Sequence, residues 1–221
     1  MTLIVACGLL REKRLIEGTG RDIVAVAGGG DGARLAQELH ALAVQSPGPI
    51  VSSGLAGALN PTLHPGDVII DGNRRLIEKL LTMLPYARRG GVIGRDDAVA
   101  AREDKRILWQ ESGAIAVDME SHVAALVAEE RGLPFAAVRV ISDTADETLP
   151  PAALAGMRPD GGMALGRVLA SLARHPAQLP ALIRTGRRAG TAFKRLGGVY
   201  DVLGRLGIGR LDLGEFPLDM G

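Results

Sequence analysis

Two short segments of the chain place carboxylates at the ends of apolar runs. Val117-Asp118-Met119-Glu120-Ser121 follows the run 114–117, and Ser142-Asp143 follows the buried-strand pattern 135–141. Carboxylates at the carboxyl edge of a parallel sheet lie where open α/β proteins bind their ligands. The pair predicts chemistry on a small polar substrate, in which one acid donates a proton and the other stabilises positive charge.

The elements that must position these acids alternate along the chain. Buried strands are predicted at Leu3–Cys7, Asp22–Ala27, Pro49–Ser52, Val68–Ile70, Val92–Ile93, 114–117 and 135–141. Helices are predicted at Ala33–Val44, Leu76–Leu84, Ala100–Glu111, 119–131, 163–175 and 178–197. This alternation predicts a single α/β domain with a central, largely parallel mixed sheet flanked by helices. We assign residues 1–160 to its core and 161–221 to C-terminal helices and a basic extension of the same domain.

Composition excludes several classes of protein. The 221 residues are 47% hydrophobic and 23% charged, as in a soluble globular protein, with a formal net charge of +1. Aromatic residues make up 3%, which disfavours a base-stacking surface, and we expect no nucleic-acid partner. The single Cys7 excludes an internal disulfide and fits a reducing compartment. Because we find no apolar run long enough to span a membrane, we expect a cytoplasmic protein.

Other candidate residues leave alternatives open. The Gly28–Gly32 loop between a strand and a helix could hold an anion on its backbone N–H groups, or could simply form a tight turn. It has neither P-loop nor dinucleotide-binding spacing. Arg139, inside an apolar strand, either forms a structural salt bridge or holds an anion. No spacing of His, Cys and carboxylates indicates a metal site.

Four motifs occur in a fixed order along the chain, and together they are more specific than any single motif. They are Ser53-Gly54-Leu55-Ala56-Gly57-Ala58-Leu59, Pro65-Gly66-Asp67-Val68, Val117-Asp118-Met119-Glu120-Ser121 and Val138-Arg139-Val140-Ile141-Ser142-Asp143-Thr144-Ala145-Asp146. This order resembles the nucleoside phosphorylase/nucleosidase superfamily, particularly the 5′-methylthioadenosine/S-adenosylhomocysteine nucleosidases. Within it the chain is most similar to the hopanoid-associated phosphorylases, or adenosylhopane nucleosidases. The short 71–98 segment, Pro150-Pro151 and the basic C-terminal region suggest that branch.

The resemblance implies roles for the two acids and their neighbours. Asp143 would be the general acid that protonates N7 of the purine, so that the base leaves neutral. Glu120 would bind the ribose 2′ and 3′ hydroxyls and stabilise an oxocarbenium-like transition state. Met119 would pack against the sugar, and the backbone near Ala98 and Val99 would hold the adenine edge. Ser142 and Gly54 would also bind the substrate.

The resemblance leaves the attacking group open between water and phosphate. Glu12 is the nearest match to the glutamate that activates water in the nucleosidases. Arg139 matches the arginine near the nucleophile, and Gly30 and Arg139 would bind phosphate if phosphate is a co-substrate. No metal or organic cofactor is implied. The superfamily resemblance further implies a homo-oligomer, at least a dimer.

Departures from the family pattern bear on the substrate. Leu55 stands where many relatives carry Ser, and the 71–98 segment lacks the usual aromatic residue against the base. The pocket is therefore expected to be more open and to suit a bulky apolar 5′ substituent. Residues 178–197 form a basic amphipathic pattern that either contacts an anionic membrane as a peripheral protein or packs on the domain with a solvated basic face.

These observations predict an enzyme that cleaves the N-glycosidic bond of an adenosine-type nucleoside and releases adenine. The favoured substrate is adenosylhopane, a lipid-linked nucleoside of hopanoid biosynthesis. One alternative is a 5′-methylthioadenosine/S-adenosylhomocysteine nucleosidase. An alternative of another class is a non-catalytic purine nucleoside-binding protein, which the proton-donating Asp143 argues against because binding alone needs no proton donor.

Overall fold

The protein was examined as a computed structural model that describes residues 2–19, 22–156, 158, 161–162 and 164–208. The strands are β1 (Leu3–Cys7), β2 (Ile23–Ala27), β3 (Ile50–Ala58), β4 (Val68–Gly72), β5 (Arg88–Arg89), β6 (Val92–Gly94), β7 (Ala116–Asp118) and β8 (Phe135–Asp143). The α-helices are α1 (Leu10–Glu17), α2 (Gly32–Gln45), α3 (Arg74–Met83), α4 (Arg102–Ser112), α5 (Ser121–Glu130), α6 (Pro151–Ala155), α7 (Leu165–Arg174) and α8 (Leu179–Ile208).

The strands form one mixed sheet. Its main path runs β2-β1-β3-β8-β4-β5, while β7 pairs with β3 and β6 pairs with β7. The pairs β1/β2, β1/β3 and β3/β8 are parallel, whereas β4/β8 and β3/β7 are antiparallel. The predicted single α/β domain with a mixed sheet is confirmed. The antiparallel neighbours of β3 and β8 make the sheet less parallel than the strand–helix alternation suggested.

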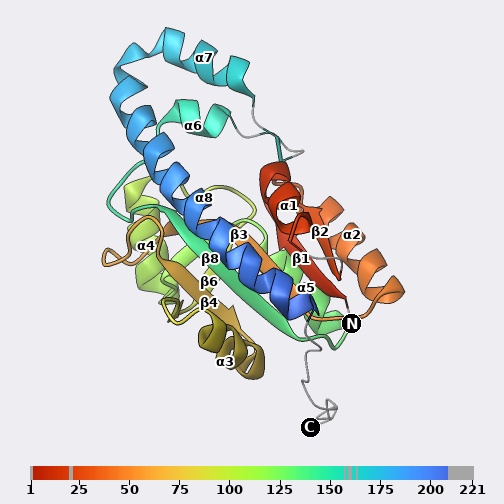
Figure 1. Cartoon of the computed structure of the whole chain (residues 1–221). Coiled ribbons are helices and arrows are strands. Elements are labelled where there is room, and N and C mark those ends of the chain that lie inside the picture. Colours follow the sequence, from red (N-terminus) through yellow and green to blue (C-terminus); the bar gives the residue numbers. More distant parts are fainter. Residues whose placement is uncertain (1, 20–21, 157, 159–160, 163, 209–221) are drawn as a thin grey trace.

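Helices cover both faces of this sheet (Figure 1). Leu3 and Val5 share one buried cluster with residues of α1, α3 and α8, while Ile4 and Ala6 share another with residues of α2 and α5. Side chains alternate between the faces of a strand, so a strand covered on both sides is apolar throughout. This explains why β1 is a continuous apolar run.

The C-terminal helix is longer than its sequence indicates. The prediction ended this helix at residue 197, but α8 continues through Gly197 and Gly198 to Ile208. Each glycine costs roughly 1 kcal/mol in a helix interior. Burial of Leu196, Val199 and Tyr200 in the core outweighs that cost. The part of the predicted basic extension at 209–221 lies outside the described residues.

Three short elements were not predicted: α1, β5 and α6. Helix α1 is strongly polar on its exposed side and buries only Glu12 and Ile16. Strand β5 consists of two exposed arginines, Arg88 and Arg89, which pair with β4. None of these segments has the apolar periodicity on which the prediction depended. Beyond the sheet, α6, α7 and the start of α8 extend away from the core (Figure 1).

Candidate active site

Arg139 lies in the middle of β8, at the centre of the site. Its neighbours Val138 and Val140 face the cluster that contains α8, so strand alternation turns Arg139 to the opposite face. The side chain is 0% exposed. Gly54 is its register partner on β3. A Cβ at Gly54 would lie 3.0 Å from both Arg139 Nη1 and the Glu12 carboxylate, so the glycine leaves room for this pair.

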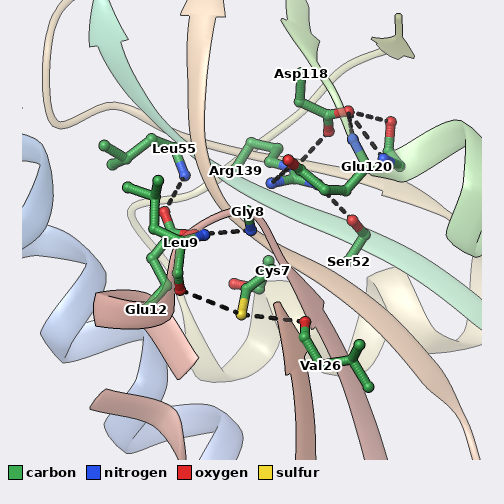
Figure 2. Close-up of polar contacts among 12 residues, drawn as sticks. Cys7, Gly8, Leu9, Glu12, Val26, Ser52, Leu55, Asp118, Glu120 and Arg139 are labelled. Atoms are coloured by element: carbon green, nitrogen blue, oxygen red, sulfur yellow. Dashed lines mark hydrogen bonds and ion pairs between the residues drawn. The ribbon is translucent and has the colours of Figure 1, made fainter. Parts of the chain in front are cut away.

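Carboxylates surround the Arg139 guanidinium (Figure 2). Nε lies 2.5 Å from Asp118 Oδ2, and Nη1 lies 3.3 Å from Glu120 Oε2. Nη2 donates a hydrogen bond to Ser52 Oγ. A buried guanidinium is stable only when charged or polar partners replace water. The structure therefore places Arg139 in a salt bridge with residues of the β7–α5 junction.

Asp118 holds this junction together through both of its carboxylate oxygens. Its Oδ1 accepts hydrogen bonds from the backbone N–H groups of Glu120 and Ser121, at 3.1 and 2.9 Å, and from Ser121 Oγ at 2.7 Å. Two otherwise unpaired N–H groups at the start of α5 are thereby satisfied. The same carboxylate orients Arg139 and fixes the backbone on which Glu120 stands.

Glu12 is buried, although it belongs to an otherwise polar helix. Its Oε2 accepts hydrogen bonds from the N–H groups of Gly8 and Leu9, at 2.9 and 2.8 Å, and its Oε1 accepts one from Leu55 at 3.1 Å. These contacts join the turn after β1 to β3 (Figure 2). The structure brings Glu12 beside Arg139, as the resemblance to the nucleosidases implied.

Burial shifts the protonation of these acids. Desolvation raises the pKa of Glu120 to about 7; the Arg139 charge opposes this rise, and Asp118 and Glu12 reinforce it. Desolvation also raises the pKa of Glu12, against the lowering effect of the Leu9 N–H and Arg139. Both glutamates therefore gain protons more readily than an exposed glutamate does. Glu120 can therefore exchange a proton near neutral pH.

Asp143 closes β8 and has a separate set of partners. Its Oδ1 accepts a hydrogen bond from Ser142 Oγ at 2.7 Å, and its Oδ2 accepts one from Lys105 Nζ at 2.5 Å. Lys105, on α4, is 0% exposed. The four residue steps from Arg139 to Asp143 correspond to about 13 Å of strand. Asp143 therefore lies apart from the carboxylates around Arg139 while sharing their strand.

The glycine loop and Met119 line a cavity beside these acids. Gly29 and Gly30 have φ values of 65° and 85°, which confirms the tight-turn interpretation of this loop. Gly30, Met119 and residues of α2 and α5 line a cavity of about 570 Å³. Ala98 and Val99 line a second hollow of about 440 Å³, and Asp96 borders both. Of the charged residues at the site, none of these four lines either hollow: Glu12, Glu120, Arg139 and Asp143.

Residues 71–174 match the phosphorylase superfamily. The segment contains Asp118, Glu120, Arg139 and Asp143, while Glu12 precedes it. The whole chain was also similar to solved structures. It covers 97% of an S-adenosylhomocysteine nucleosidase from Streptococcus pyogenes, solved with 5-methylthiotubericidin, over 93% of its own length, with 18% identity and a TM-score of 0.68.

Two further solved structures have the same fold. The chain covers 100% of the Streptococcus pneumoniae MTA/SAH nucleosidase, solved with 8-aminoadenine, over 91% of its own length, with 15% identity and a TM-score of 0.63. It covers 88% of the Helicobacter pylori futalosine hydrolase over 65% of its own length, with 18% identity and a TM-score of 0.54. The chain has the nucleoside phosphorylase/nucleosidase fold.

The structure assembles most of the predicted site residues but not all of them in one place. Glu12, Glu120 and Arg139 meet, with Gly54 beside them, while Asp143 and Ser142 form a second group at the end of β8. Ala98 and Val99 lie in the hollow near α4, away from Met119 and Gly30. Contacts of these residues with substrate or phosphate stay predictions.

Sequence reasoning missed Lys105. It occurs in a helix with charged residues on most of its surface, and only its i,i+3 spacing to the buried Leu108 marks it as inward-facing. Among the described residues, no group of His, Cys, Asp and Glu side chains has the arrangement of a metal site. Within the same residues, no helix combines the length and apolar character that a membrane span requires.

Proposed function

We propose that this protein cleaves the N-glycosidic bond of an adenosine-type nucleoside and releases adenine. The observation that carries this proposal is the placement of two distinct acids, Glu120 just after β7 and Asp143 at the end of β8, on two buried strands that both pair with β3. Glu120 pairs with the Arg139 guanidinium in a cluster that also contains Asp118 and Glu12, and Asp143 accepts a hydrogen bond from the Lys105 ammonium. Breaking the bond leaves positive charge on the ribose and negative charge on the base, and the two groups match these two demands.

Each acid then has a defined task. Glu120 binds the ribose hydroxyls in its ionised form and stabilises the oxocarbenium-like sugar. Asp143 passes a proton to N7 of the purine, so that neutral adenine leaves. Met119 packs against the sugar from the cavity that it shares with Gly30. A protein that only bound purine nucleosides would not need the proton donor.

The charge around Arg139 favours water over phosphate as the attacking group. Asp118, Glu120 and Glu12 all act on the guanidinium, so carboxylates outnumber the cation that they surround. A phosphate entering this cluster would meet net repulsion in a poorly solvated site. Glu12, whose pKa is raised by burial, is suited to accept a proton from water. We therefore propose hydrolysis, with Glu12 as the base.

The proposed substrate is adenosylhopane, in hopanoid lipid biosynthesis. Its support is the sequence resemblance to the hopanoid-associated branch and the apolar Leu55 in place of a polar residue. A 5′-methylthioadenosine/S-adenosylhomocysteine nucleosidase is the alternative, since solved structures bearing that name have this fold. The two proposals differ in the 5′ substituent, so competition between substrates separates them.

The test is release of free adenine by the purified protein. Adenosylhopane in detergent, 5′-methylthioadenosine and inosine are each incubated with and without phosphate, and the products are followed by mass spectrometry. The proposal expects adenine and a ribosyl lipid from adenosylhopane in both conditions. A phosphoribosyl lipid formed only with phosphate would replace hydrolysis by phosphorolysis. Faster turnover of 5′-methylthioadenosine would favour the alternative, and no adenine from either adenine nucleoside would overturn the proposal.

We further propose that the helical segment formed by α7 and the start of α8 contacts the anionic surface of the cytoplasmic membrane leaflet, where a lipid-linked substrate would reside. Leu165 and Leu169 of α7 are 68% and 65% exposed, and Leu179 and Ile183 of α8 are also exposed. Residues 165–190 contain Arg167, Arg174, Arg184, Arg187 and Arg188 and no Asp or Glu. Exposed leucines beside a segment that carries arginines and no acidic residues suit an anionic lipid surface.

Sedimentation with vesicles tests this contact. The protein should sediment with phosphatidylglycerol vesicles at low salt and remain in the supernatant with phosphatidylcholine vesicles. The double substitution Leu165→Gln and Leu169→Gln should abolish sedimentation and leave turnover of 5′-methylthioadenosine unchanged. Equal recovery with both lipids, or self-association through these leucines without vesicle binding, would overturn the membrane proposal.

A further inference from the structure

Lys105 is a buried lysine whose every donor is used. Its Nζ donates to Asp143 Oδ2 at 2.5 Å, to the Thr144 carbonyl at 3.0 Å and to the Glu147 carbonyl at 3.1 Å. An ammonium group has three N–H donors, so all of them are satisfied within the protein. Lysine is almost never fully buried unless it is paired. The chain thus maintains a costly buried cation against the residue assigned as the general acid.

The charged groups around this pair are engaged with one another. On α4, Glu103 pairs with Arg106 at 2.5 Å, and Arg102 lies 3.6 Å from Asp146 of the loop after β8. From α8, Arg188 pairs with Glu147. These neighbouring ions have other partners, so Lys105 is the cation that directly contacts Asp143 in the described residues.

A general acid must hold a proton before the base leaves, and an isolated carboxyl is mostly ionised at neutral pH. The Lys105 ammonium donates a direct hydrogen bond to Asp143 Oδ2, so a proton can pass along this contact to the carboxylate. Lys105 cannot reach the substrate itself, because all of its N–H groups point to Asp143 and to backbone carbonyls. It can act only through Asp143.

We propose that Lys105 is a positioning residue that also supplies, through Asp143, the proton taken by the leaving base. This inference rests on the proposed function. As the C1′–N9 bond breaks, its electron pair passes to the purine, the Lys105 ammonium gives a proton to the Asp143 carboxylate, and Asp143 gives a proton to N7, which leaves a Lys105 amine and an Asp143 carboxylate. Water adds its oxygen to C1′ and loses a proton to Glu12. After product release, solvent returns a proton to the Lys105 amine and removes one from Glu12.

The pH profile separates this role from mere structural support. In the wild type the donor is the pair, so adenine release should persist on the alkaline side of neutrality. In Lys105→Met the donor is a lone carboxyl, which must already be protonated. The alkaline limb of kcat/KM should therefore move by at least about 2 pH units toward acid, and activity at pH 8 should fall by about 10²-fold or more.

Lys105→Arg divides positioning from proton supply. A guanidinium can hold the Asp143 carboxylate in place, but it does not release its proton. This variant should keep the wild-type KM and lose about 10-fold or more in kcat. Arg106→Met, an exposed cation on the same helix, is the matched control and should retain the wild-type profile.

Each outcome decides between the two proposals. If the wild type releases no adenine from any substrate, the proposed function fails, and the Lys105 role fails with it. If the wild type is active and Lys105→Met shows the same alkaline limb, or only a uniform loss of rate, the Lys105 role alone is overturned. Should Lys105→Met not fold, Lys105→Arg decides: wild-type kcat overturns the role, and a selective loss of kcat supports it.

Discussion

The two halves of the candidate site differ in their balance of charge. On the proposed sugar side, Asp118, Glu120 and Glu12 act on one guanidinium, that of Arg139. On the proposed base side, Asp143 faces Lys105 one to one. In the proposed reaction the first arrangement would place carboxylates where a carbocation forms, and the second would place a proton donor where a purine anion would otherwise depart. One strand, β8, carries a residue of each half and sets their separation.

The largest effect is expected from removing the proton path on the base side. Asp143→Asn cannot pass a proton to N7, so kcat for adenine release should fall by roughly 10²–10⁴-fold while the nucleoside still binds. Single-turnover adenine release and equilibrium binding of the same substrate measure the two properties. Wild-type turnover by this variant would remove Asp143 from the mechanism.

On the sugar side, Glu12→Gln tests activation of water. The amide keeps the size of the side chain but cannot accept the proton, so kcat should fall by roughly 10²–10⁴-fold in the absence of phosphate. Added phosphate should not restore the rate if hydrolysis is correct. Restoration by phosphate would show that the nucleophile is phosphate and that Glu12 does not act as a base.

Glu120→Gln should lower the activity and raise the free energy of unfolding. The pKa of Glu120 is raised from its ordinary 4.5 to about 7, so the folded state binds more protons than the unfolded state between these values. Folded stability therefore falls as pH rises through that window and stays lower above it. The variant should raise the free energy of unfolding at pH 8 by roughly 1–3 kcal/mol. Urea denaturation at pH 5 and pH 8 measures the difference.

The pH dependence of wild-type activity should show that ionised Glu120, which lowers stability, is needed for catalysis. Glu120 must be ionised to stabilise the sugar, so kcat/KM should decline as pH falls below about 7. In Glu120→Gln the remaining activity, lower by roughly 10²–10³-fold, should lose this acid limb. An unchanged acid limb in the variant would assign it to another group, such as Glu12.

The smallest effect is expected at Ser52, which accepts a hydrogen bond from Arg139. Ser52→Ala should cost about 1–2 kcal/mol of stability and reduce kcat only a few-fold, because the carboxylates still hold the guanidinium. Ser53→Ala is a close control: its Oγ is buried in the same strand and has no hydrogen-bond partner in the described structure. Equal losses in both variants would deny Ser52 a part in holding Arg139.

The sequence predicted the site residues that directly follow an apolar run or interrupt one. Glu120 and Asp143 each follow a buried strand, and the strand that carries Arg139 is apolar on both sides of it. Glu12 was reached only through the family resemblance, because α1 itself is polar and short. The structure adds the reason for its burial, which is its hydrogen bonds to the turn after β1 and to β3.

Lys105 could not be found in the same way. Helix α4 carries three basic and three acidic residues, and spacing alone does not show which of them the tertiary fold buries. The long α8 was underestimated for a related reason, because the packing of Leu196 and Tyr200 on the sheet stabilises a helix through two glycines. In both cases contacts between distant segments, which local sequence does not encode, determine the outcome.

The most direct test of the charge division is base release from paired nucleosides that differ only at position 7 of the purine. An adenine nucleoside and its 7-deaza counterpart carry the same 5′ group, and both should bind with similar affinity. The account predicts release of adenine and no detectable release of 7-deazaadenine, because carbon at position 7 cannot accept the proton held by Asp143 and Lys105. Release of both bases at comparable rates would contradict it.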